Sequence, residues 1–139
     1  MNVKTLAAII GTASMLVSCE FNLWGPSISE VSVCEKPNPS EGCEKNQNTF
    51  QPTTPRIFAT AKLDNAVEGT KVKVLWRLTQ SPTAKNVRIY EKEFTTKLDQ
   101  SQITTALAPA KTWIPGTYEV SFSLSEDQSK RETQKFQVK

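Results

Sequence analysis

The feature that most constrains this chain is an alternation of apolar and polar residues that recurs in short segments. The clearest case is the segment 118–124, in which apolar side chains occupy every second position. A period of two residues is typical of a β-strand that buries one face and leaves the other in water. The alternation is not accompanied by a sustained 3.6-residue period. The sequence therefore predicts an all-β fold.

Seven segments carry this signal, and residues that favour turns separate them. They are 28–34, 57–64, 72–78, 87–96, 102–107, 118–124 and 134–138. Short strands at such spacing predict an antiparallel β-sandwich, and 139 residues fit one domain. In the first segment we expect Ile28, Glu30, Ser32 and Cys34 on one face and Ser29, Val31 and Val33 on the other. Trp76 is expected in the core, and the polar segment 44–54 outside any strand.

The start of the chain has the pattern of an export signal. Lys4 precedes an apolar stretch of about 12 residues, which is too short to span a bilayer. The sequence Leu16-Val17-Ser18-Cys19 then resembles the lipobox of bacterial lipoproteins. That resemblance implies that residues 1–18 are removed and that Cys19 is lipidated. The protein would then be held on a membrane by an acyl anchor, with residues 19–27 as a tether.

Two further cysteines, Cys34 and Cys43, form an even pair once Cys19 is set aside. The residues between them include Pro, Asn, Ser and Gly, which favour turns. Because an exported chain meets an oxidising compartment, we predict a Cys34–Cys43 disulfide. A metal site is the alternative, but the chain has no histidine and no third thiol nearby. A redox pair is a weaker alternative, because the spacing is not C-x-x-C.

Composition excludes several classes of function. Without histidine there is no Ser-His-Asp or Cys-His catalysis, and no cofactor-binding fingerprint occurs. We therefore expect a protein that is not an enzyme and binds no cofactor. The leader contributes only Lys4, so its removal lowers the net charge from +3 to +2. Basic and acidic residues are interspersed, and we expect no nucleic-acid partner.

The order of features resembles an immunoglobulin-like fold. Trp76 lies in the third strand, where such sandwiches place a buried Trp, and Pro115–Tyr118 resembles their tyrosine corner. The cysteines that join the sheets in antibody domains are replaced by Ala61 and Val120. A closer resemblance is to small Ig-like domains of bacterial envelope lipoproteins, over residues 28–139. Its motifs are Cys34 and Cys43, Gly69-Thr70 with Val72, Val74 and Trp76, the turn from Trp113 to Tyr118, and Phe136 to Val138.

Three surface features are candidates for contact with a partner. Trp113 lies in a loop bounded by prolines, where it would be either an exposed aromatic anchor or a cap on the core. Phe58 and Leu75 lie on the otherwise polar sides of their strands. They would either form a small exposed apolar patch or be covered by the segment 44–54. A basic row on one strand would favour anionic lipid or polysaccharide, or would simply be solvated. It consists of Lys71, Lys73 and Arg77.

The sequence thus predicts a lipid-anchored module of the bacterial envelope that binds a protein or serves a structural role. Its expected partners are the membrane, through the acyl anchor at Cys19, and an envelope protein. The alternative is a lipoprotein that binds a carbohydrate or small ligand. Glu20 follows Cys19 in place of the Asp that retains many lipoproteins in the inner membrane, which favours the outer membrane.

Overall fold

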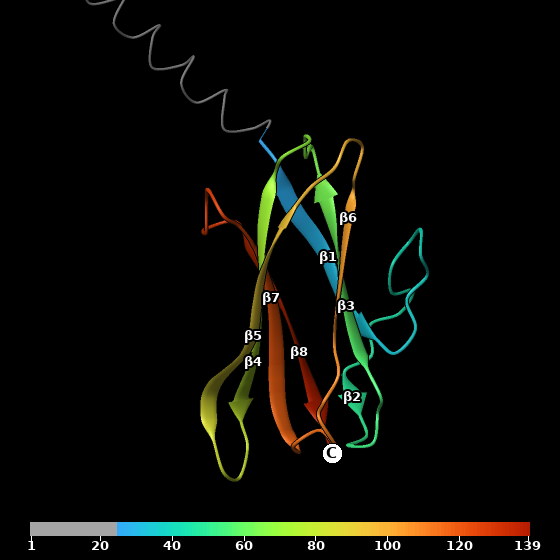
Figure 1. Cartoon of the computed structure of the whole chain (residues 1–139), viewed down its shortest axis with the longest axis vertical. Helices are drawn as coiled ribbons and strands as arrows, with labels where there is room; N and C mark the ends of the chain where they lie inside the picture. The colour runs from blue at the N-terminus through green and yellow to red at the C-terminus, as the bar shows by residue number, and fades with distance from the viewer. Residues whose placement is uncertain (1–24) are drawn as a thin grey trace, which may run out of the picture.

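The computed structural model describes residues 25–139, which form eight β-strands in two facing sheets (Figure 1). The strands are β1 (Ser27–Cys34), β2 (Thr49–Phe50), β3 (Ile57–Asp64), β4 (Lys71–Gln80), β5 (Lys85–Thr95), β6 (Gln102–Leu107), β7 (Gly116–Leu124) and β8 (Arg131–Val138). One sheet has the order β1-β3-β6 and the other β2-β8-β7-β4-β5. All neighbours are antiparallel except β2 and β8. The predicted all-β sandwich is confirmed.

The seven predicted strands are present, and β2 is an additional one. It lies within the segment 44–54 that was expected to contain no strand, so that expectation is wrong. Two residues are too few to show an alternation, and for this reason β2 left no signal in the sequence. Its Phe50 is 2% exposed and its ring lies 5.5 Å from that of Phe136. The segment therefore contributes to the core between the sheets.

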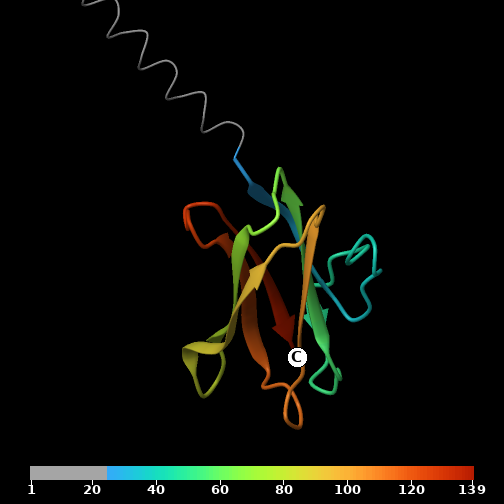
Figure 2. The same cartoon turned by 45° about the horizontal axis from the view of Figure 1, so that its top comes forward.

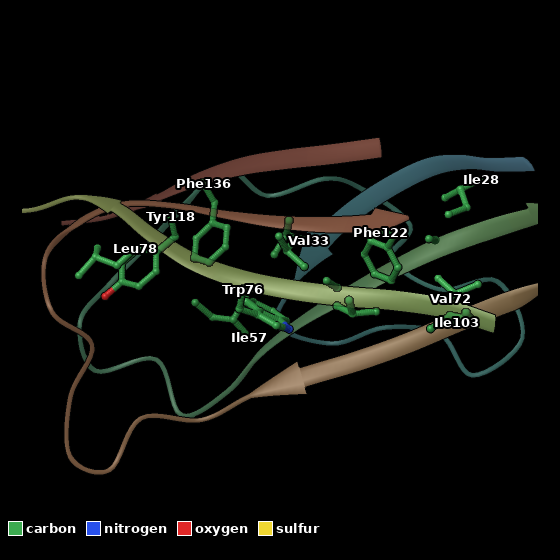
Figure 3. Close-up of a cluster of buried hydrophobic side chains, with 14 of the residues drawn as sticks. Ile28, Val33, Ile57, Val72, Trp76, Leu78, Ile103, Tyr118, Phe122 and Phe136 are labelled. Atoms are coloured by element: carbon green, nitrogen blue, oxygen red, sulfur yellow. The ribbon is translucent and has the colours of Figure 1, made fainter. Parts of the chain in front are cut away.

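The core consists of apolar side chains from the inner faces of both sheets (Figure 3). Trp76 on β4 is paired with Val120 on β7, and both side chains are completely buried. Phe136 packs edge-on against Trp76 with ring centroids 6.1 Å apart. It stacks against Tyr118 at 5.3 Å. The predicted core position of Trp76 is confirmed, because a period of two puts each apolar row of the central strands on the inner face.

The first strand corrects the expected pattern of faces. A bulge interrupts the pairing of β1 with β3 between Ser29 and Ser32, and Glu30 adopts a φ of 48° there. An extra residue in one strand reverses the alternation beyond it. Ile28 and Val33 are therefore both buried in the core, although the uninterrupted alternation placed them on opposite faces.

The predicted signal peptide 1–18, lipidated Cys19 and the first part of the tether lie outside the described residues. The last tether residue, Ser27, is already the first residue of β1. Across residues 25–139 the structure contains no helix with the length and hydrophobicity of a membrane span.

Candidate functional site

The predicted disulfide between Cys34 and Cys43 is present, with Cα atoms 5.8 Å apart. It holds the intervening loop against the outer face of β3. The backbone N–H of Cys43 donates a hydrogen bond to Thr60 Oγ1 at 3.1 Å, and Thr60 is buried as a result. Within the loop, Asn38 and Gly42 exchange two backbone hydrogen bonds of 2.7 and 2.8 Å. The disulfide thus fixes a loop that has little apolar content of its own.

A polar groove of about 870 Å³ lies between this loop and β3. Lys62 forms an ion pair with Glu30 at 2.7 Å, and the hydrogen bond to Glu30 raises the pKa of the lysine. Both side chains are more than half exposed, so the pair contributes little to stability. Glu41, Glu44 and Asp64 also line the groove. In the described part of the chain no three acidic or thiol side chains gather in a way that could hold a metal ion.

Trp113 is a cap on the core and not an exposed anchor. Its side chain is 4% exposed, and its ring lies 5.6 Å from that of Tyr118 in an edge-on arrangement. The indole Nε1–H donates to the carbonyl of Thr54 at 2.8 Å, and the backbone N–H donates to Pro52. Of the two alternatives that the sequence left open for Trp113, the core cap is confirmed and the exposed anchor is excluded.

The tyrosine corner that the resemblance implied is present. Tyr118 is buried, and its hydroxyl donates a hydrogen bond of 2.5 Å to the carbonyl oxygen of Ile114. Burial raises the pKa of Tyr118, because the phenolate would lose its hydration, and the hydrogen bond to Ile114 acts in the opposite direction. Ala61 and Val120 are buried in opposite sheets. Apolar packing thus occupies the region that a disulfide spans in antibody domains.

Phe58 and Leu75 do not form one patch. Phe58 lies on β3, on the outer face of the three-stranded sheet, with the Arg56 guanidinium 6.0 Å from its ring. Leu75 lies on β4, beside Ser121 and Glu91 on the outer face of the other sheet. Both are partly exposed. The alternative of a shared patch is therefore excluded, because the polar sides of strands from different sheets point away from each other.

The basic row lies where the alternation predicted, on the outer face of β4. Lys73 and Arg77 line a groove of about 280 Å³ together with Arg131 of β8. These three side chains take part in none of the salt bridges found among residues 25–139. Ser121 and Thr133, directly paired across β7 and β8, contribute hydroxyl groups between them. The three cations would attract an anionic group, and Glu91 and Glu119, which line the same groove, would oppose it.

The most accessible strand is β5, at the edge of the five-stranded sheet (Figure 2). All of its residues except Phe94 are exposed. Val87, Ile89 and Tyr90 are exposed by 41%, 40% and 39%, so apolar surface accumulates along one strand. The alternation in the sequence indicates this strand but not its exposure, because an alternation does not show whether a second sheet covers the apolar face.

No protein-family model matches this chain, and no curated protein matches its sequence. Solved structures resemble it in fold. An immunoglobulin-like protein from Pseudomonas aeruginosa aligns with a TM-score of 0.53 and 13% identity, covering 83% of this chain and 97% of that one. The CARDB domain of a Pyrococcus furiosus protein aligns with a TM-score of 0.48 and 10% identity, covering 82% of this chain and 89% of that one. A Niemann-Pick type C2 protein from the Japanese carpenter ant aligns with a TM-score of 0.47 and 15% identity, covering 82% of this chain and 92% of that one.

The likeness to the Pseudomonas aeruginosa protein extends over nearly its whole length. At 13% identity such a likeness concerns the fold and not the activity. Together with the two-sheet topology and the tyrosine corner, it shows that residues 25–139 form an immunoglobulin-like β-sandwich.

Proposed function

We propose that this chain is a lipid-anchored lipoprotein of the bacterial cell envelope that acts without catalysis, as a protein-binding or structural module. The lipobox-like sequence ending at Cys19 supports the anchor, and Glu20 supports placement in the outer membrane. The absence of histidine from the sequence supports a non-catalytic role. The observation that carries the binding role is the exposed apolar surface of β5.

The exposed face of β5 has the chemistry of a protein contact. Tyr90 offers a large ring with a polar tip, and aromatic residues of this kind are enriched where proteins meet. Val87 and Ile89 add aliphatic surface beside it. β5 pairs with β4 along one edge only. Along its other edge no strand among residues 25–139 pairs with it, so the backbone groups there are available for an added strand.

The same strand carries features that restrict indiscriminate pairing. A bulge interrupts its register with β4 between Trp76 and Arg77. Lys92 lies on the face aligned with buried Val74, and its ammonium group is 4.8 Å from the centre of the Phe94 ring. Bulges and inward-facing charges are devices that protect sheet edges from aggregation. An edge protected in this way favours a partner that recognises the side chains as well as the backbone.

Capture of partners from crosslinked envelopes tests the proposal. The full-length tagged protein is compared with Ile89→Asp on β5 and with Ile114→Asp, a matched control that is 52% exposed in the loop between β6 and β7. We expect the parent and the control to retain one or two proteins in stoichiometric amounts, and Ile89→Asp to lose them at an unchanged melting temperature. Equal capture by all three proteins, or capture of no protein, would contradict a docking role for β5.

A second candidate function is the binding of an anionic glycan. It is favoured by the groove that contains Lys73, Arg77 and Arg131, where Arg77 Nε is buried and has no hydrogen-bond partner within residues 25–139. A buried donor without an acceptor is unfavourable, and a carboxylate or phosphate beside the guanidinium would improve its surroundings. In the capture experiment, this function predicts that glycan is retained by Ile89→Asp and lost by Arg77→Gln.

A further inference from the structure

The two most exposed large apolar side chains in the described part of the chain lie at one end of the sandwich. Val67, in the turn between β3 and β4, is 71% exposed, and Leu98, in the loop between β5 and β6, is 72% exposed. Neither residue belongs to a strand. Neither side chain is packed into the core, so both are available for a contact outside the sandwich.

Hydrogen bonds hold these two loops together. Thr96, the first residue of the second loop, donates through Oγ1 to the carbonyl of Val67 at 2.7 Å. Its Oγ1 also accepts the backbone N–H of Thr70 at 2.9 Å. The loops are thereby fixed as one surface, and Val67 and Leu98 belong to it.

The start of β1 lies at the same end of the molecule. Ser27 is paired with Asp64, the residue just before the β3–β4 turn. The ammonium group of Lys130 donates to the carbonyl of Pro26 at 3.0 Å, which ties the chain entry to the β7–β8 turn. Both views show the first residues of β1 beside the β3–β4 turn and the β5–β6 loop (Figures 1 and 2).

The distance from the anchor to this end is limited by the length of the chain. Ser27 follows Cys19 by only eight residues, and even a fully extended chain of that length spans no more than about 26–29 Å. An acyl group on Cys19 would therefore hold the end with Val67 and Leu98 close to the bilayer. This step rests on the proposed function, since it requires the lipid anchor.

We propose that this end of the sandwich is a membrane-contact surface, with Val67 and Leu98 inserted among the lipid headgroups. Charges of both signs flank the two apolar residues: Glu68 follows Val67, and Lys97 and Asp99 lie on either side of Leu98, so the charge at this end selects neither an anionic nor a neutral surface. Contact by two aliphatic side chains is weak alone, and the anchor supplies the affinity. The contact instead sets the orientation: the end that carries Ile114 points away from the bilayer.

Depth-dependent quenching tests this orientation. Full-length protein carrying Leu98→Cys or the matched control Ile114→Cys is labelled at the new thiol with an environment-sensitive fluorophore. Each is reconstituted into vesicles of phosphatidylethanolamine and phosphatidylglycerol that contain lipids with a nitroxide near the headgroup. We expect quenching several-fold stronger at position 98 than at position 114. Labelled Val67→Cys should behave like Leu98→Cys.

The outcomes separate this inference from the proposed function. Flotation of the same samples reports whether the protein is anchored, whatever the position of the label. Protein that floats with the vesicles but is quenched equally at positions 98 and 114 retains the anchor and overturns the membrane-contact surface. Protein that does not float overturns the anchor, and the membrane-contact surface with it.

Discussion

Among the glycines at positions 25, 42, 69 and 116, Gly116 is the one where an added side chain would meet the closest neighbouring atom. It begins β7 with a φ of 158°, and a Cβ atom there would collide with the carbonyl oxygen of Gln80. Because that oxygen belongs to the backbone, it cannot move aside without disturbing β4. The close approach explains why the Pro115-Gly116 turn leads into the tyrosine corner with glycine at this position.

We predict that Gly116→Ala lowers the free energy of unfolding by about 1–3 kcal/mol, the usual cost of overpacking. Chemical denaturation measures it. Gly25→Ala is the matched control, because the nearest atom to its new Cβ is the end of the Lys130 side chain and not a backbone atom. If the two variants unfolded at the same denaturant concentration, the close contact at Gly116 would be refuted.

The hydroxyl of Tyr118 is the second residue-scale test. Tyr118→Phe removes the hydrogen bond to Ile114, and the loss should cost about 0.5–1.5 kcal/mol. Tyr90→Phe is the matched control, since Tyr90 is exposed on β5 and its hydroxyl makes no hydrogen bond within residues 25–139. Equal stability of the two variants would show that the corner contributes nothing.

The raised pKa of Tyr118 also predicts a dependence on pH. Burial makes the folded protein hold this proton more tightly than the unfolded chain does. The contribution to stability is therefore complete below the unfolded pKa of about 10 and is lost as the pH rises through the higher folded value. Denaturation between about pH 9 and 11 should show a smaller decline for Tyr118→Phe than for Tyr90→Phe. Parallel declines would contradict this.

Single residues were predictable from the sequence when their environment followed from the strand period. Trp76 is an example, because its neighbours two residues away on β4 are apolar as well. Trp113 lies in a loop, where no period applies, and its burial depends on Pro52 and Thr54 from a distant segment. Val67 and Leu98 left only a faint signal, an apolar residue within a turn or loop.

At the scale of elements, the alternation predicted the strands well but not their context. In β1 the bulge at Glu30 reversed the faces, and nothing in the sequence marks a bulge at a glutamate. For β5 the sequence indicated an apolar face at Val87 and Ile89. The structure leaves that face uncovered, since the opposite sheet has only three strands to the five of this one.

The loss of the disulfide that closes the loop between Cys34 and Cys43 should have a predictable effect on stability. Replacing both Cys34 and Cys43 by Ser should cost about 2–3 kcal/mol, because the unfolded chain regains the freedom of a short loop. The backbone contact of Cys43 with Thr60 would be weakened as well. Denaturation of the parent with and without reductant measures the effect, and the double variant should not respond to reductant. If reductant lowered the stability of both proteins equally, the disulfide would not be the source of the change.

At the scale of the whole molecule, the inner faces of the two sheets are used for the core. Contacts with other molecules are therefore left to the outer faces, the edges and the ends of the sandwich. The account assigns the exposed edge at β5 to a protein partner and the end that carries Val67 and Leu98 to the membrane. The second assignment places the sandwich on a bilayer, so it depends on the lipid at Cys19, which also defines the proposed lipoprotein.

Intact-mass spectrometry of the protein purified from membranes tests that central claim most directly. The account predicts a mature chain that begins at Cys19, with the mass of residues 19–139 increased by covalently attached acyl groups. The variant Cys19→Ala should keep the leader and carry no acyl mass. A mature chain that begins at another residue, or one in which Cys19 is unmodified, would contradict the account.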